Sequence, residues 1–195
     1  DVMMMVNGVI PYIIKINKVS GEVHWKKEVP CDQRVSVHGQ FRRFRYTSEG
    51  TFLVPYLSED KVVEFDQEMN EIWRYEVGGP WAAIRLKNGN TRITAEKEGR
   101  TIGVNRAGEI IWQLDLTELP PPFRLAGSQS CVRLENGNTI LCSMGDGGKA
   151  PQLIEVTSDK KVVWCVEDWK YLGPATAIQI LSENGVPEIP GDCQR

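Results

Sequence analysis

The sequence predicts an all-β fold, a β-propeller of four-stranded antiparallel blades, and three observations lead to this prediction. A phrase of two strands and a turn recurs four times, and each copy ends on a tryptophan. A second hairpin lies between successive phrases. The tryptophans are 48, 39 and 52 residues apart, and a β-rich period of about 40–50 residues is typical of propellers. These residues are Trp25, Trp73, Trp112 and Trp164.

Each phrase divides into two strands. In its first half, apolar and polar residues alternate with the period of two that half-buried strands show, as in YIIKIN and KVVEFD. Turn residues such as VSG and RAG follow, and the second strand then carries the tryptophan. We expect all four indoles to be mostly buried, to stack on the next blade and to donate their N–H to a carbonyl there.

The second hairpin is clearest at 81–95 and 128–142, which are near copies. Asn88-Gly89 and Asn136-Gly137 predict two-residue type I′ turns, in which both central residues need a positive φ. This register places Cys131 directly opposite Cys142, with Cα atoms about 5.5 Å apart. We expect two buried thiols, since a disulfide between flat neighbouring strands would be strained and easily reduced.

The repeats organise residues 1–195 as a single domain, with blades at approximately 1–29, 40–77, 81–116 and 128–167. The first blade lacks an inner strand, and the sequence ATAIQIL at 175–181 predicts such a strand. Pairing of the two would close a four-bladed ring and leave no edge strand unpaired. The alternative is a fragment of a larger propeller.

Composition excludes several classes of function. The net charge of −3 argues against a nucleic-acid partner. No stretch approaches the roughly 20 apolar residues of a membrane span. The five cysteines lack metal-binding spacing, so we expect no metal site. The lysine of GDGGK (145–149) lacks phosphate-loop spacing.

Several stretches resemble known propeller families. INKVSGEVHW (16–25) resembles the tryptophan-docking repeats of pyrroloquinoline-quinone-dependent dehydrogenases. The chain is more similar overall to bacterial quinoprotein-like six-bladed propellers, the surface-layer-like or arylsulfotransferase-like group. The similar stretches are 38–66, RLKNGNTRI, RLENGNTIL and 150–156.

The resemblance implies about two further blades, so it favours a fragment of a six-bladed ring over a closed four-bladed one. It also implies a bacterial exported protein, located in the periplasm or outside the cell. The chain has no adjacent Cys-Cys pair and no calcium-ligand cluster, so we expect no quinone or other cofactor.

His38, Gln40 and Arg42 form the first candidate site. They alternate along one predicted strand and would point together into the mouth of the central channel, where a cation beside a histidine can tune its protonation. The resembling group carries the same HxQFR string at this place. The alternative is that they are ordinary polar residues at the end of a strand.

Other candidates lie at the starts of inner strands and on long loops. Trp81 and Gln129 begin inner strands, as Phe41 does, and would either form a ligand floor or pack between blades. Arg45, Arg85 and Arg133 recur at one blade position and predict a contact between blades. The loops at 116–127, 145–149 and 167–174 bring binding chemistry to one rim: Arg124, Asp146, Lys149, Trp169 and Tyr171.

Two functional hypotheses remain open. The first is a non-catalytic binding or scaffold propeller whose partner is a small molecule, such as a carbohydrate, or a protein. The second is an enzyme of the lyase, hydrolase or sulfotransferase class that uses residues around His38. The absence of a nucleophile motif, metal cluster or cofactor loop favours the first.

Overall fold

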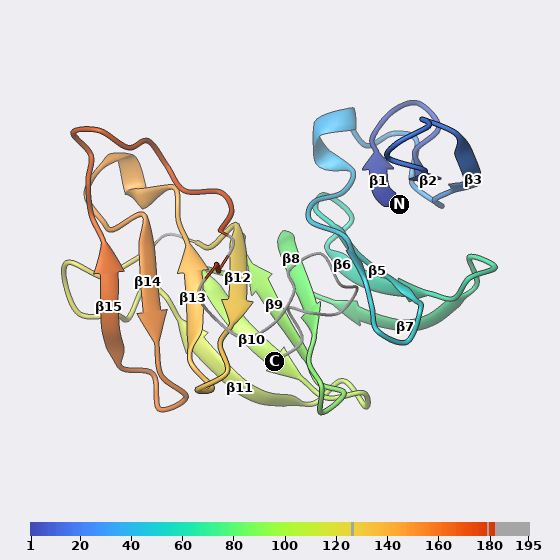
Figure 1. Cartoon of the computed structure of the whole chain (residues 1–195). Helices are drawn as coiled ribbons and strands as arrows, with labels where there is room; N and C mark the ends of the chain where they lie inside the picture. The colour runs from blue at the N-terminus through green and yellow to red at the C-terminus, as the bar shows by residue number, and fades with distance from the viewer. Residues whose placement is uncertain (126, 179, 182–195) are drawn as a thin grey trace.

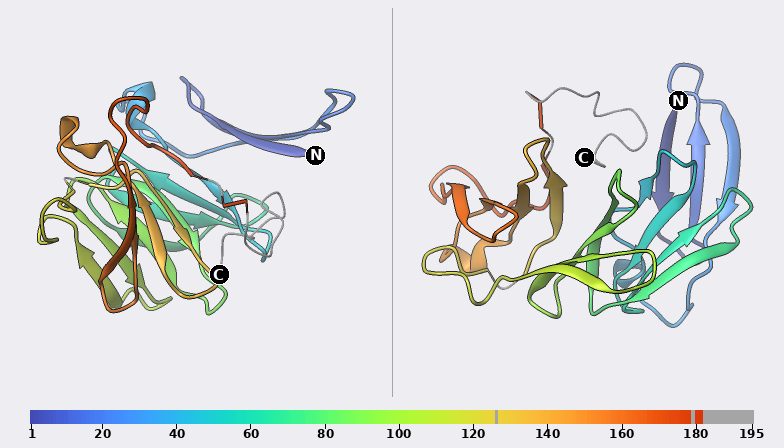
Figure 2. Two further views of the ribbon diagram at one scale, coloured as in Figure 1. Left: turned by 60° about the vertical axis from the view of Figure 1, so that its left-hand side comes forward. Right: turned by 90° about the horizontal axis from the view of Figure 1, so that it is seen from below.

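The computed structural model of the chain describes residues 1–125, 127–178 and 180–181. In this part of the chain, the strands form four antiparallel sheets, which we call blades 1 to 4 in chain order. Figures 1 and 2 show the blades following one another along an arc, with blade 1 at one end and blade 4 at the other. No helical segment among the described residues is long and apolar enough to cross a membrane.

Blade 1 has three strands and the other blades have four, and each blade is a simple meander. Blade 1 holds β1 (Val2–Val6), β2 (Tyr12–Ile16) and β3 (Val23–Glu28). Blade 2 holds β4 (Arg45–Tyr46), β5 (Phe52–Tyr56), β6 (Lys61–Phe65) and β7 (Glu71–Glu76). Blade 3 holds β8 (Pro80–Arg85), β9 (Thr91–Ala95), β10 (Arg100–Val104) and β11 (Ile110–Asp115). Blade 4 holds β12 (Ser130–Arg133), β13 (Thr139–Cys142), β14 (Leu153–Val156) and β15 (Val162–Val166).

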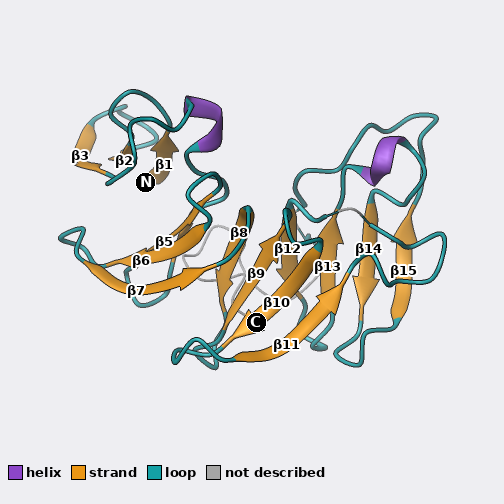
Figure 3. Cartoon of the chain, turned by 180° about the vertical axis from the view of Figure 1, so that it is seen from behind, coloured by secondary structure: helices purple, strands orange, loops and turns teal. Residues whose placement is uncertain are grey.

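Two short 3₁₀ segments complete the secondary structure of the described residues, η1 (Val37–Gly39) and η2 (Gly145–Gly147). Figure 3 shows both, in purple, at the same edge of the arc.

The hairpins between inner strands differ from the predicted two-residue turns. In β8–β9 the amide of Gly89 donates to Leu86 O at 2.9 Å, and the amide of Leu86 donates to Asn90 O at 2.8 Å. Gly89 has a φ of 83°, whereas Asn88 is not among the positive-φ residues. The loop therefore has three residues, a turn closed by a left-handed glycine, which is the next commonest hairpin type.

The β12–β13 hairpin has the same form, with Gly137 at a φ of 87°. The extra loop residue shifts the register by one, so that Cys131 pairs with Leu141 and Cys142 pairs with Ser130. The predicted Cys131–Cys142 pair was wrong for this reason. Both cysteines are buried thiols, as expected.

A β-bulge precedes the tryptophan in every blade. In blade 2 the register shifts between Glu64 and Phe65, so Glu64 faces Trp73. The same shift leaves Lys15, Gly103 and Glu155 facing the tryptophans of blades 1, 3 and 4. A bulge re-aims the side chains that flank it. Here it fixes one slot beside each tryptophan.

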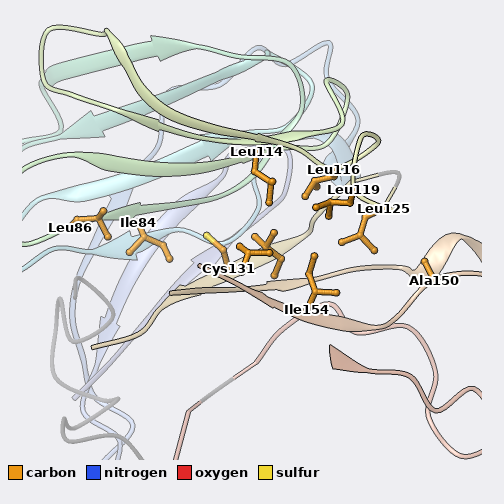
Figure 4. Close-up of a cluster of buried hydrophobic side chains, with 11 residues drawn as sticks. Ile84, Leu86, Leu114, Leu116, Leu119, Leu125, Cys131, Ala150 and Ile154 are labelled. Atoms are coloured by element: carbon orange, nitrogen blue, oxygen red, sulfur yellow. The ribbon is translucent and has the colours of Figure 1, made fainter. Parts of the chain in front are cut away.

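The hydrophobic core lies between the blades. Blades 3 and 4 share a cluster of buried side chains that includes Ile84, Leu114 and Leu116 on one side and Leu141 and Ile154 on the other. Figure 4 shows this cluster between the facing sheets. Each internal blade thus buries both of its faces, as radial packing requires.

The tryptophans join each blade to the next. Trp73 Nε1 donates to Arg106 O at 3.1 Å, and Trp112 Nε1 donates to Ser158 O at 2.9 Å. Both acceptors lie in the turn that precedes the tryptophan strand of the following blade. Trp25 instead meets Phe52 edge-on, with ring centroids 5.9 Å apart. The predicted contact with a following blade is confirmed at all three positions.

Trp164 departs from this pattern, because 45% of its surface is exposed. The expectation that all four indoles are mostly buried was wrong here. No sheet follows β15 among the described residues, so this indole has no neighbouring blade to cover it.

A buried carboxylate adds to the contact between blades 2 and 3. The Glu64 side chain is fully buried and accepts hydrogen bonds from Arg85 of blade 3, from Arg106 of blade 3 and from the Thr51 hydroxyl at 2.6 Å. Arg85 also stacks on Trp73, with its guanidinium carbon 4.8 Å from the ring centroid. Burial lowers the pKa of Arg85, and the charge of Glu64 opposes this shift. The predicted inter-blade role of this recurring arginine is confirmed at Arg85.

The inner strand expected at 175–181 does not form at the described residues of that segment, 175–178 and 180–181. Ala175 N donates to the carbonyl oxygen of Ser143, which directly follows β13 of blade 4. The carbonyl oxygen of Thr176 accepts from Arg43 Nε, next to blade 2. These bonds hold the segment against blades 2 and 4 and away from β1. Blade 1 accordingly has β1 at its inner edge.

We predict that Trp112→Ala and Trp164→Ala differ sharply in their effect on this chain. Loss of the Trp112 side chain removes a packed inter-blade contact and should lower the free energy of unfolding by about 3–5 kcal/mol. Loss of the exposed Trp164 should cost less than about 1 kcal/mol. Urea unfolding followed by circular dichroism measures both. Equal losses would contradict the inter-blade role of these tryptophans.

We also predict that Glu64→Gln destabilises the chain by about 3–5 kcal/mol, because it leaves the buried Arg85 charge without its counter-charge. Glu71→Gln is the matched control, since Glu71 pairs with Arg74 on the exposed side of blade 2. That surface pair should contribute less than about 1 kcal/mol. A small effect of Glu64→Gln in the same urea titration would refute the proposed importance of the carboxylate.

Candidate functional site

The structure does not assemble His38, Gln40 and Arg42 as the sequence predicted. Residues 37–39 form η1, so His38 lies exposed on a helical turn and not on a strand. Gln40 is buried and uses both ends of its amide on blade 1: Oε1 accepts from Gly8 N at 2.9 Å and Nε2 donates to Gly8 O at 2.7 Å. Gln40 thus ties blades 1 and 2 together.

Arg42 meets a second candidate, Trp81. Its guanidinium carbon lies 4.5 Å from the centroid of the indole ring. Nη1 donates to Phe41 O at 3.1 Å, while Nε and Nη2 are buried without a hydrogen-bond partner. The indole N–H of Trp81 donates to the Glu96 carboxylate, in the loop after β9. A cation, an aromatic ring and a carboxylate therefore lie in contact where the first residues of β8 approach blade 2.

The next residue, Arg43, contacts Trp81 through its backbone. Arg43 forms an isolated bridge with Ala82, and its N donates to Trp81 O at 3.1 Å, which links the inner segments of blades 2 and 3. Arg43 Nε donates to Thr176 O at 3.1 Å. Burial lowers the pKa of Arg43, and repulsion from nearby Arg45 lowers it further. We call Arg42, Arg43, Trp81 and Glu96 the inner-strand cluster.

The loop candidates of blade 4 fall into two groups. Trp169 has a structural role, because its Nε1 donates to Ala150 O at 3.1 Å and its ring lies against Gly145. A Cβ on Gly145 would come within 1.9 Å of that ring, so only glycine fits. Gln129 is also buried, at the start of β12. The remaining loop candidates are exposed: Arg124, Asp146, Lys149 and Tyr171.

A cavity of about 250 Å³ lies at the end of β3, away from the inner-strand cluster. Its lining includes Pro11, Val29, Pro30 and Cys31. Burial, a hydrogen bond with Glu59 and the negative charge of that residue raise the pKa of Cys31 to about 12. The thiol therefore stays protonated at neutral pH, which makes it a poor nucleophile.

Sequence reasoning missed several charged residues that are central to the structure. Glu64 and Arg92 are the clearest, since both are buried within strands and both have apolar or neutral residues on either side, in VEF and TRI. A charge inside such a strand is itself a signal, because a buried charge needs a partner. Among the described residues, no group of three or more His, Cys, Asp or Glu side chains could hold a metal ion.

Comparisons with known proteins bear on the fold. No family model matches the chain, and no curated protein matches it. The chain is similar to a solved structure of a protein of unknown function from Bacteroides caccae, with a TM-score of 0.77 and 23% identity. The match covers 89% of this chain and 65% of that one.

Two further solved structures are similar at lower identity. One is a catalytically inactive virginiamycin B lyase from Staphylococcus aureus with quinupristin, with a TM-score of 0.60, 12% identity and coverage of 84% and 51% of the two chains. The other is BamB from Moraxella catarrhalis, with a TM-score of 0.53, 12% identity and coverage of 85% and 49%. The chain thus spans less than two thirds of the length of each of these proteins. The lyase and BamB are β-propellers, and together with the four antiparallel sheets they establish that this chain has the β-propeller fold that its sequence predicts.

Proposed function

We propose that the chain is a non-catalytic binding and scaffold propeller, and that it holds a small organic anion at the inner-strand cluster. The observation that carries this proposal is the Arg42 guanidinium, which lies over the Trp81 ring with two buried nitrogens that have no hydrogen-bond partner. The next residue, Arg43, brings a second positive charge to the segment where blades 2 and 3 meet. Isolated bridges from Phe41 to Tyr56 and from Arg43 to Ala82 tie this segment to β5 and β8, which positions the arginines as a binding site requires.

The charge balance of the cluster favours an anion. Arg42, Arg43 and the adjacent Arg45 bring three positive charges, while Glu96 brings one negative charge and already accepts from Trp81. Two nitrogens of Arg42 have no hydrogen-bond partner. Guanidinium groups bind carboxylate and sulfate through paired, charge-assisted hydrogen bonds. The indole beside them suits a ring-shaped ligand, so an acidic sugar combines both kinds of contact.

The comparisons support binding in a general way. A lyase of the same fold was solved with quinupristin, and another neighbour is BamB. Binding of a small molecule or of a protein is therefore compatible with this architecture, which hosts many functions. An exported bacterial location remains a prediction that rests on the resemblance of the sequence.

Isothermal titration with glucuronate and with glucose tests the proposal, because the two probes differ only in the carboxylate. We expect glucuronate to bind and glucose not to bind. Arg43→Gln should weaken glucuronate binding by about 10–100-fold, the effect of removing a hydrogen bond to a charged group. Arg34→Gln is the control, since the Arg34 side chain is 90% exposed and pairs with Asp32. Equal binding of the two sugars, or unchanged binding by Arg43→Gln, would refute the anion site.

The alternative is an enzyme of the lyase, hydrolase or sulfotransferase class centred on His38. It has less support, because His38 is exposed on η1 and the Gln40 amide is occupied by Gly8. A His38→Ala variant that loses turnover of any substrate in these classes, while keeping its thermal stability, would favour this alternative over ours.

A further inference from the structure

The gap between blades 3 and 4 differs in charge from the gap between blades 2 and 3. In the latter, Glu64 occupies the slot beside the tryptophan and pairs with Arg85 and Arg106. In the former, the slot belongs to Gly103, which faces Trp112. The negative charge of the slot is therefore absent, although the arginine of the following inner strand is kept as Arg133.

Arg92 enters this slot from β9. It pairs across the sheet with Gly103, and its guanidinium carbon lies 3.8 Å from the centroid of the Trp112 ring. The position of a Cβ on Gly103 would be 3.2 Å from Arg92 Nη1, so the absence of a side chain at Gly103 makes room for the guanidinium. The equivalent residue in blade 2 is Leu53, which faces Glu64.

Among the described residues, no carboxylate forms a salt bridge with the Arg92 guanidinium, and no Asp or Glu contributes to its pKa shift. Its side chain is 4% exposed, and Nε and Nη1 are buried without a hydrogen-bond partner. Arg133, on β12 of blade 4, donates from Nη1 to the Thr139 hydroxyl at 3.0 Å. Burial, together with repulsion from Arg133, lowers the pKa of Arg92 to about 10. Arg92 therefore stays charged at neutral pH, and Arg133 is charged as arginines in proteins are.

Two like charges in a buried gap are unfavourable unless an opposite charge joins them. The adjacent gap solves this problem with a carboxylate. The Arg92 guanidinium already takes the room that Gly103 leaves, so the missing charge must be compact. A buried hydroxyl without a partner, Thr101 Oγ1, lies on the same strand two residues from Gly103.

We propose that the gap between blades 3 and 4 binds one small inorganic anion of the size of chloride or bromide, held by Arg92 and Arg133 beside Gly103. This site is separate from the inner-strand cluster and does not depend on the proposed function. Its role is to supply between blades 3 and 4 the negative charge that Glu64 supplies between blades 2 and 3.

The first test is urea unfolding at constant ionic strength, in which sodium gluconate is replaced stepwise by sodium chloride or bromide. A site of this kind should give a saturable stabilisation, with the unfolding equilibrium constant falling about 100-fold when the halide reaches 100 times its Kd. The titration is repeated in Arg43→Gln, which removes any effect of gluconate at the inner-strand cluster. Absence of a saturable halide effect in both backgrounds would overturn the proposal.

The second test moves the carboxylate of blade 2 into blade 3. In Gly103→Glu the new side chain supplies the missing charge, and the flexible end of Arg92 can move to admit it. We expect Gly103→Glu to fold and to lose the halide dependence. The surface control Arg74→Gln should keep the full halide dependence. The neutral Gly103→Gln should weaken the dependence less than Gly103→Glu does. If Gly103→Glu does not fold, Arg92→Leu provides the same comparison, since it removes the charge that needs the anion. Full halide dependence in Gly103→Glu or in Arg92→Leu would overturn the proposal.

The third test locates the ion. Crystals grown in sodium bromide should give an anomalous difference peak within about 3.5 Å of Arg92 Nε or Nη1, the reach of a hydrogen bond to an anion. Bromide peaks confined to the outer surface would overturn the proposal. The thiol of Cys131, which lies beside both arginines, is the internal competitor, because its thiolate would supply the same charge. A halide dependence that appears only in Cys131→Ala would show that the thiolate fills this role, and would equally overturn the proposal.

Discussion

The hydrogen bond from the tryptophan of one blade to a turn of the next is the contact on which the rest of this structure depends. A single four-stranded sheet has two apolar faces and cannot bury both alone. Trp73 and Trp112 set the position of the following blade by donating to its turn at Arg106 and Ser158. Because each bond lies at the outer strand, it fixes the angle between sheets and so brings the inner strands together. The inner-strand cluster is a consequence of that convergence.

The bulge beside each tryptophan gives the repeat a second constant feature. It places one residue of the neighbouring strand opposite the tryptophan, and that residue is Lys15, Glu64, Gly103 or Glu155. The backbone geometry is the same in all four blades, but the charge of the slot ranges from positive to negative. The repeat therefore keeps packing constant while each gap has its own electrostatics. Glu64 fills the slot beside the tryptophan in blade 2, and the Arg92 side chain fills the equivalent slot in blade 3.

The fold could be predicted from the sequence because its signals repeat. Strand alternation, turn residues and the four tryptophans all indicate one supersecondary unit, and their agreement outweighs any local ambiguity. The direction of the indole bonds follows from the same repeat. Register could not be predicted as well. The Asn-Gly dipeptide is compatible with both a two-residue and a three-residue hairpin loop. The extra residue of each bulge has no characteristic residue type, so the bulges cannot be recognised in the sequence.

The site was predicted less well, and the reason is also physical. Arg42 and Trp81 were both candidates, yet their contact joins segments about 40 residues apart and has no signature in either segment. Gln40 and Trp169 have side chains suited to binding, but Gly8 and Ala150 occupy their polar atoms. A residue type shows what a side chain can bond to, whereas its place in the fold decides which partner it meets.

The arrangement of blades in an open arc also bears on how motion is distributed through the chain. In a linear array, stability is the sum of each unit and its contacts with neighbours. Among the described residues, blades 2 and 3 each have two neighbouring blades, whereas blades 1 and 4 each have one. Local opening should therefore need least free energy at the two ends, so that backbone amides of β1 and β15 exchange with solvent before those of β9 and β10. The inner-strand cluster, which joins blades 2 and 3, lies at the most slowly exchanging part of the molecule.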